Sequence, residues 1–313
     1  MKAADCKALI ILVVAVAVGL LVAVAGSQGG ATVAGFPLFA LGVAAAFLIQ
    51  WLAFIPAFKA QTEKYYDLTG ALTYISITVL LVVLTPGVDP RGLLLAAMVV
   101  VWAARLGAFL FRRVMKHGKD DRFDELKPSF FRFLNTWTLQ GLWVVLTAAA
   151  AWIAITSATR VGLDGWALAG VVVWAAGFGI EVVADGQKSR FKADPANKGR
   201  FISTGLWSKS RHPNYFGEIV LWIGVLLVAV PVLEGWQWVA LLSPVFVAFL
   251  LVKGSGIPPL EKKADQKWGG QPDYEAYKKN TPVLVPTLRQ RSSTGSTAGG
   301  KRFQEPNSWA ASE

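Results

Sequence analysis

Residues 210–218, Ser-Arg-His-Pro-Asn-Tyr-Phe-Gly-Glu, place five side chains suited to ligand binding directly before an apolar segment. Arg211 offers a planar fork for phosphate or carboxylate, and His212 is a titratable donor. Asn214 and Tyr215 add neutral hydrogen bonds, and Glu218 adds an acid at the start of the apolar segment. Charged groups at the edge of a membrane are costly unless they are paired or functional. We therefore interpret this signature motif, residues 210–218, as part of a ligand-binding site at a bilayer surface.

A second polar group precedes the signature motif, at the end of the apolar run 165–183. Glu181 and Asp185 are four residues apart and share a helix face, and Lys188 follows one turn later. The chain has no glycine-rich fingerprint after a strand, so a nucleotide would have to be held by helix ends and loops. Arginines would then bind phosphates, whereas Asp185, Asn214 and Glu218 would bind ribose or amide groups.

Arg105 is the third candidate, because it lies about two helical turns deeper in its apolar run than Arg112 and Arg113. A buried arginine requires a carboxylate, carbonyl oxygens or a phosphate as its partner, which makes it a functional candidate. The alternative is a structural ion pair with Glu181 or Glu218.

The segment 61–70 is rich in acids and tyrosines. Glu63, Tyr65 and Tyr66 are of types that can polarise a substrate carbonyl or donate a proton to it. Tyrosines are also common at headgroup depth, so a solvated interfacial loop is the alternative interpretation.

Eight apolar runs predict the elements that position these residues: 9–25, 36–58, 71–84, 92–111, 136–157, 165–183, 216–233 and 236–252. Several reach the length of about 20 residues that crosses a hydrocarbon core. Backbone groups in lipid must be satisfied within the segment, so we predict helices. The fold class is therefore an all-α, multi-pass transmembrane bundle of about seven to eight spans. Run 71–84 is short enough for a short or partly re-entrant span.

The positions of the basic residues predict the topology. With a cytoplasmic amino terminus and eight spans, every Lys and Arg except Arg91, Arg105 and Arg160 lies on the cytoplasmic side. Both termini are therefore predicted to be cytoplasmic. The first run resembles a signal-peptide core but is interpreted as a retained helix, because the topology closes with it present. The net charge of +11 comes from basic residues that border the apolar runs and do not form one folded basic face. Nucleic acid is therefore not predicted as a partner.

Residues 1–288 are predicted to form one membrane domain, with the signature and cofactor region at 181–281. Residues 289–313 are rich in Ser, Thr and Gly and are predicted to form a disordered cytoplasmic tail. Cys6 is the single cysteine, and His117 and His212 lie in different loops, so no metal site is predicted. The sequence indicates no particular protein partner.

Several blocks, in order, resemble the steroid 5-alpha-reductase-like membrane proteins, closest to their poorly characterised branch. They are the signature motif and residues 61–70, 102–107, 122–125, 181–188, 256–261 and 274–281. The resemblance implies a membrane reductase that uses NADPH to saturate a carbon–carbon double bond conjugated to a carbonyl in a steroid-like or other lipid substrate. It implies a cofactor-binding set of Arg105, Asp185, Lys188, Arg211, His212, Asn214, Tyr215 and Glu218, with Arg105 near the phosphates. The membrane would be the endoplasmic reticulum in a eukaryote and the inner membrane in a bacterium.

One block departs from the steroid enzymes, which carry a Gln-Glu pair in an early helix to grip the substrate carbonyl. Residues 51–56 here contain no carboxylate, so Glu63, Tyr65 and Tyr66 are the predicted catalytic substitutes. Two alternatives stay open. The first is an isoprenylcysteine carboxyl methyltransferase-like enzyme that uses S-adenosylmethionine, which shares the Arg-His-Pro-x-Tyr element. The second is a non-catalytic lipid-binding membrane protein.

Overall fold

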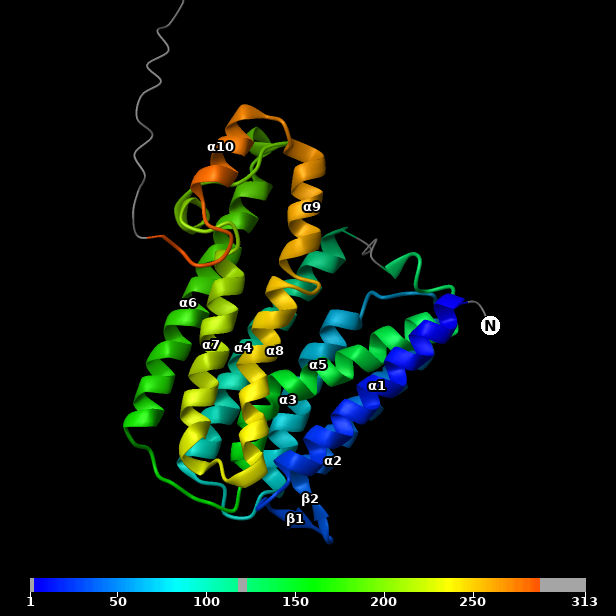
Figure 1. The fold of residues 1–313 in the computed structure, drawn as a ribbon, viewed down its shortest axis with the longest axis vertical. Helices are drawn as coiled ribbons and strands as arrows, with labels where there is room; N and C mark the ends of the chain where they lie inside the picture. The colour runs from blue at the N-terminus through cyan, green and yellow to red at the C-terminus, as the bar shows by residue number, and fades with distance from the viewer. Residues whose placement is uncertain (1–2, 118–122, 288–313) are drawn as a thin grey trace, which may run out of the picture.

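The computed structural model describes residues 3–117 and 123–287, and these residues are almost entirely helical (Figure 1). The helices are α1 (Ala3–Gly26), α2 (Leu38–Lys59), α3 (Tyr66–Leu84), α4 (Pro90–His117), α5 (Phe130–Thr156), α6 (Gly165–Ala193), α7 (Pro213–Ala229), α8 (Leu242–Val252), α9 (Ile257–Trp268) and α10 (Pro272–Asn280). Short 3₁₀ turns lie at η2 (Pro195–Asn197), η3 (Gly205–Ser208), η4 (Val230–Val232) and η5 (Gly235–Leu241). Strands β1 (Thr32–Val33) and β2 (Phe36–Pro37) form a two-residue antiparallel ladder.

Eight helical segments are long and apolar enough to cross a membrane, and each contains one of the predicted apolar runs or most of it. The all-α, multi-pass fold is therefore confirmed. The eighth segment joins η5, α8 and α9 over Gly235–Trp268, with a break at residues 253–256. The tail at 289–313 lies outside the described residues.

Helix α3 differs from the short or re-entrant span that run 71–84 suggested. It begins at Tyr66 and continues for 19 residues, about 28 Å, which is enough to span the hydrocarbon core. Its first turns are polar, and Thr73 donates to the carbonyl of Thr69, which satisfies the hydroxyl within the helix. The apolar run 71–84 is therefore the later part of a longer helix, Tyr66–Leu84.

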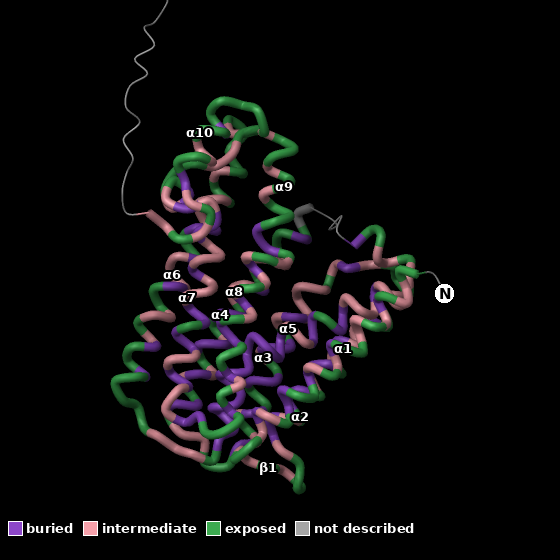
Figure 2. Tube along the Cα trace, in the orientation of Figure 1, coloured by how far each residue is buried: buried purple, intermediate pink, exposed green. Residues whose placement is uncertain are grey.

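Helix α5 lies in the middle of the bundle, buried along most of its length (Figure 2). Some of its polar groups bond to neighbouring helices, as where the Trp152 indole donates to the Thr78 hydroxyl at 2.8 Å. In an apolar environment such hydrogen bonds avoid the cost of an unpaired buried donor.

Helices α6 and α7 make the closest helix–helix approach near the candidate site. Gly170 and Gly177 on α6 face Gly224 and Gly217 on α7. A Cβ at Gly177 would lie 2.5 Å from the Leu221 nitrogen and 2.6 Å from the Gly217 oxygen, so no larger residue fits. Small residues at such spacing allow helix backbones to touch in membranes. This contact sets the first turns of α7 against the last turns of α6.

Arg91 connects several elements near the last turn of α7, at the other end of the α6–α7 pair. Its side chain is 1% exposed and donates to the carbonyls of Val161, Gly162 and Val228 at 2.6–2.9 Å. It also pairs with Asp164 at 2.8 Å, and this hydrogen bond lowers the pKa of the Asp164 carboxyl. One guanidinium therefore joins α4, α7 and the loop before α6.

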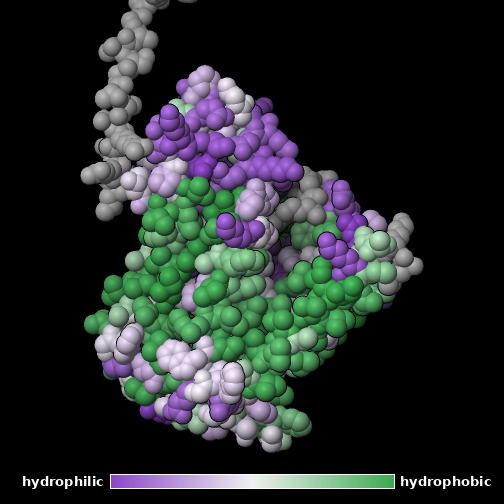
Figure 3. Space-filling model, in the orientation of Figure 1, coloured by the Kyte–Doolittle hydropathy of each residue, from purple (hydrophilic) through white to green (hydrophobic). Residues whose placement is uncertain are grey.

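The surface is divided into a polar cap around α9 and α10, a broad apolar belt, and a mixed opposite end (Figure 3). The hairpin β1–β2 lies at the opposite end, and the amino-terminal end of α1 points away from it (Figure 1). This division is typical of a protein whose belt contacts lipid. The cytoplasmic placement of the cap and of both termini stays a prediction.

Candidate functional site

Arg105 lies at the centre of a polar cluster between α4, α6 and α7. Its Nη1 is 2.6 Å from Glu181 Oε1, and its Nη2 is 2.7 Å from Asp185 Oδ2. Asn214 Nδ2 donates to the other Asp185 oxygen at 3.2 Å. The expected alternative of an ion pair with Glu181 is thus present, and Asp185 is the second partner. Because two carboxylates occupy its guanidinium, Arg105 holds Asp185 and Asn214 in position.

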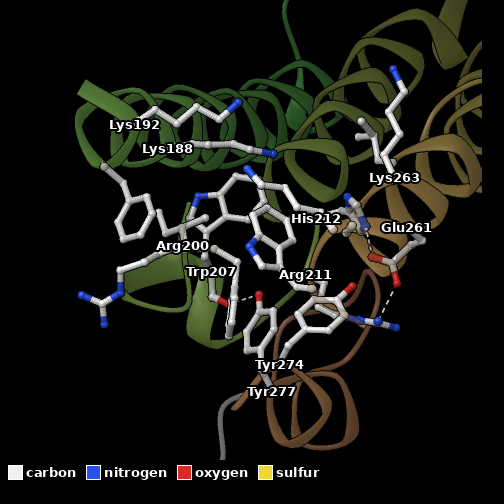
Figure 4. Close-up of a pocket in the computed structure, with 17 residues that line it drawn as sticks. Lys188, Lys192, Arg200, Trp207, Arg211, His212, Glu261, Lys263, Tyr274 and Tyr277 are labelled. Atoms are coloured by element: carbon white, nitrogen blue, oxygen red, sulfur yellow. Dashed lines mark hydrogen bonds and ion pairs between the residues drawn. The ribbon is translucent and has the colours of Figure 1, made fainter. Parts of the chain in front are cut away.

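A pocket of about 280 Å³ lies beyond this cluster, where α6, η3, α9 and α10 meet (Figure 4). Its charged lining consists of six basic residues and one acid, which are Lys188, Lys192, Arg200, Arg211, Lys263, Lys267 and Glu261. Its rings are Phe191, Phe201, Trp207, His212, Trp268, Tyr274 and Tyr277. We call it the basic pocket. Cations and aromatic faces together suit an anion that carries a flat ring system.

The aromatic floor of the basic pocket is fixed by hydrogen bonds. The Trp207 indole donates to the Ala184 carbonyl at 3.0 Å, and Tyr277 donates to the Trp207 carbonyl at 2.7 Å. Lys188 lies over the Trp207 ring, 4.3 Å from its centroid. Burial raises the pKa of Tyr277, so its phenol stays a donor. The ring faces are therefore held in place before any ligand binds.

Glu261 pairs with the two charged residues of the signature motif. Its Oε2 is 2.5 Å from Arg211 Nη1, and its Oε1 is 2.8 Å from His212 Nε2 (Figure 4). The His212 ring stacks on Tyr215 with 5.7 Å between centroids. Burial lowers the pKa of His212, and the hydrogen bond to Glu261 opposes that shift. At neutral pH Glu261 therefore acts mainly as the counter-ion of Arg211.

The segment 281–287, which follows α10 in the polar cap, holds the signature motif in place. The Arg211 amide donates to the Pro282 carbonyl at 2.9 Å, and the Ser210 hydroxyl donates to the Leu284 carbonyl at 2.7 Å. The Thr287 amide donates to the Lys209 carbonyl at 3.0 Å. The loop before α7 is therefore held by two main-chain hydrogen bonds and by the Ser210 hydroxyl, independently of the Arg211 side chain.

A second pocket, of about 160 Å³, lies between α3, α4, α5 and α7. Its lining is mostly apolar, with polar groups from Tyr66, Asp67, Tyr74, Gln140 and Glu218. We call it the apolar pocket. Glu218 is one turn of α7 beyond Asn214, so the apolar pocket and the Arg105 cluster share that helix face. The Tyr74 ring is 6% exposed, and its hydroxyl makes no hydrogen bond of ordinary geometry within the described residues.

The predicted cofactor residues gather at one end of the bundle. Lys188, Arg211 and His212 line the basic pocket, Tyr215 stacks on His212, and Asp185 and Asn214 belong to the Arg105 cluster. Glu218 lines the apolar pocket. The structure thus brings together residues from Arg105 to Glu218 of the chain.

The three predicted catalytic residues are separated. Tyr66 lines the apolar pocket and donates to the Thr136 carbonyl at 3.1 Å. Glu63 is not among the lining residues; it pairs with Lys127 at 2.7 Å, and that hydrogen bond raises the pKa of Lys127. Tyr65 is 54% exposed and stacks on Phe111. Their catalytic roles stay predictions, and Tyr66 is the one that faces the apolar pocket.

Sequence reasoning missed Tyr74 and four of the cations, Lys192, Arg200, Lys263 and Lys267. Tyr74 had one available signal, since it is an ionisable side chain inside the apolar run 71–84. Glu261 belonged to a family-like block but had no assigned role. Its partners lie about 50 residues away, and no local pattern predicts that contact.

The region that matches a known family includes the residues of both pockets. The family model of DUF1295, described as a protein of unknown function, matches residues 53–281. The chain belongs to the DUF1295 family. Every residue that lines either pocket lies inside the matched region.

Among curated proteins, an uncharacterized protein of Schizosaccharomyces pombe is 26% identical over 164 residues, which cover 44% of this chain and 48% of the yeast protein. The chain therefore spans about half the length of this curated relative. No solved structure matches the chain significantly. Among residues 3–117 and 123–287, no group of three His, Cys, Asp or Glu side chains is placed to hold a metal ion.

Proposed function

We propose that this DUF1295 protein is an NADPH-dependent membrane reductase that saturates a carbon–carbon double bond conjugated to a carbonyl in a lipid substrate. The observation that carries the proposal is the basic pocket, in which six cations and one acid surround aromatic rings. The likeness of the signature motif to the steroid 5-alpha-reductase-like proteins supports the same reading.

The residues present fit the chemistry of NADPH. Its three phosphate groups require several cations, which the basic pocket supplies, and its adenine requires a flat apolar face, which the half-buried rings of Phe201 and Trp268 offer. Asp185 and Asn214 can bind ribose hydroxyls or the carboxamide. S-adenosylmethionine carries no phosphate, so the surplus of cations favours a reductase over a methyltransferase.

The apolar pocket is the proposed substrate half of the site. When bound, NADPH would supply a hydride to the carbon β to the carbonyl, and a proton from solvent would complete the reduction at the α carbon. We assign Tyr66 to the carbonyl oxygen, because it is the predicted proton donor that lines this pocket.

A titration tests the cofactor assignment. Full-length protein in detergent is titrated with NADPH, NADH and S-adenosylmethionine, with binding measured by tryptophan fluorescence and thermal shift. We expect NADPH to bind more tightly than NADH, because the 2′-phosphate adds a charge for the cations of the basic pocket. Preference for S-adenosylmethionine would overturn the reductase in favour of a methyltransferase. Binding of none of the three would favour a non-catalytic lipid-binding protein.

A further inference from the structure

Two of the cations in the basic pocket are already compensated by acids. Arg211 pairs with Glu261, the acid of the lining, which also hydrogen-bonds to His212. Lys188 is attracted by the charge of Asp185 on the same helix. A ligand group with two negative charges gains less at these cations, because the neighbouring carboxylates repel it.

Lys192 of α6 and Lys267 of α9 also line the basic pocket, and neither pairs with an acid in the part of the chain that the structure describes. The charges that act on Lys192 are those of Arg113 and Lys267, so the two lysines repel each other. Arg200 and Lys263 point away from the centre of the pocket (Figure 4). Lys192 and Lys267 are therefore the uncompensated pair, and an anion that binds both relieves their repulsion.

The rings that suit adenine lie next to Lys267. The Trp268 indole donates to the Gly199 carbonyl at 2.6 Å, and Phe201 packs edge-on to Trp268 with 5.9 Å between centroids. The amino group of Lys267 is 4.7 Å from the centroid of the Trp268 ring. When adenine contacts these rings, a charged group on its ribose therefore lies close to Lys267.

We propose that Lys192 and Lys267 bind the 2′-phosphate of NADPH and so select it over NADH. The 2′-phosphate is a monoester with a charge of about −2 at neutral pH, and it is attached to the ribose that carries adenine. Both lysines are exposed, so the phosphate lies at the mouth of the pocket and keeps part of its hydration. This inference rests on the proposed reductase function and names the residues that decide its cofactor preference.

Two charge-removing variants test this assignment. Full-length protein in detergent is titrated with NADPH and NADH, with binding measured by tryptophan fluorescence. We expect Lys192→Met and Lys267→Met each to weaken NADPH binding about tenfold, the usual worth of a hydrogen bond to a charged group, and to leave NADH binding unchanged. Unchanged NADH binding also shows that the variants are folded. Lys262→Met, at an exposed cation of α9 outside the pocket lining, is the matched control and should bind both like the wild type.

A smaller pair of probes isolates the 2′-phosphate from the nicotinamide. We expect the wild type to bind 2′,5′-ADP more tightly than 5′-AMP, and the protein with both lysines replaced by methionine to lose this preference. A wild-type ratio of NADPH to NADH affinity in both lysine variants overturns the inference, as does an equal loss in Lys262→Met. If the wild type binds NADPH and NADH equally, the inference fails and the reductase stands. If it binds neither, the proposed function fails and the inference falls with it.

Discussion

Arg211 joins the signature motif to the basic pocket through its pair with Glu261. We predict that Arg211→Ala weakens NADPH binding about 10- to 100-fold, the usual worth of a hydrogen bond to a charged group. Folding should be retained, because the loop is held by the Arg211 amide and by Ser210. Titration of the purified variant measures the effect. Arg190→Ala is the control, since Arg190 is an exposed cation of α6 outside the pocket lining; equal losses in both variants would contradict a specific site.

Tyr66 carries the proposed contact with the substrate carbonyl. Tyr66→Phe removes one donor to the developing negative charge and should lower the rate of NADPH oxidation with an enone substrate roughly 100-fold. NADPH affinity should change little, because Tyr66 lines the apolar pocket and not the basic pocket. Val79→Ala, on the exposed face of the same helix, should match the wild type. An unchanged rate in Tyr66→Phe would remove Tyr66 from the reaction.

His212 makes stability depend on pH. Burial depresses its folded-state pKa below the usual 6.5, with Glu261 opposing the shift and Lys188 and Arg211 adding to it. The unfolded chain therefore binds the proton more readily. The contribution of His212 to stability is full above about pH 6.5 and is lost as the pH falls through the folded-state pKa. Apparent melting temperature in detergent should fall between pH 7.5 and pH 5.5.

The control for this pH dependence is His212→Gln, which keeps a polar side chain but does not titrate. We expect it to flatten the fall in melting temperature over the same interval. A wild-type slope in His212→Gln would assign the effect to other titratable groups, which include the carboxyl groups and His117.

The contact between α6 and α7 decides whether the cofactor residues meet. Gly177→Ala places a Cβ against the α7 backbone, and overpacking of this kind costs about 1–3 kcal/mol. Separation of the helices should also move Asn214 away from Asp185 and weaken NADPH binding. Gly179→Ala is the matched control, because a Cβ at Gly179 meets nothing within 4 Å. Thermal unfolding and NADPH titration of both variants measure the difference; a Gly177→Ala protein as stable as Gly179→Ala would contradict the close contact.

The distribution of basic residues predicts how the whole bundle is oriented in the membrane. With Cys6 replaced by serine, single cysteines at Gly162→Cys and Gln266→Cys report the two ends, and both positions are exposed. We expect an impermeant maleimide to label Gly162→Cys in intact cells and Gln266→Cys only after permeabilisation, because basic segments stay cytoplasmic. The reverse pattern would place the basic pocket on the side that lacks NADPH.

The spans were predictable from local sequence. A segment in hydrocarbon must be long, apolar and internally hydrogen-bonded, and each of these conditions is met within the segment itself. The start of α3 was not predictable in the same way, because its first turns are polar and are stabilised by neighbouring helices, as where Gln140 donates to the Tyr66 carbonyl.

The candidate site also has a part that was predictable from local sequence and a part that was not. Asp185, Lys188 and the signature motif were visible in the sequence because charged residues beside apolar runs are unusual. The partners of Arg105 are 76 and 80 residues away, and Glu261 is 50 residues from Arg211. Tyr74 was distinguished only as an ionisable side chain inside the apolar run 71–84, and which face of α3 lines a pocket depends on the helices packed against it. Tyr65 was predicted together with Tyr66, but only Tyr66 lines the pocket. The sequence alone determined which residues are chemically costly in a membrane; only tertiary structure decided which of them meet, because that depends on how closely glycine-lined helices approach.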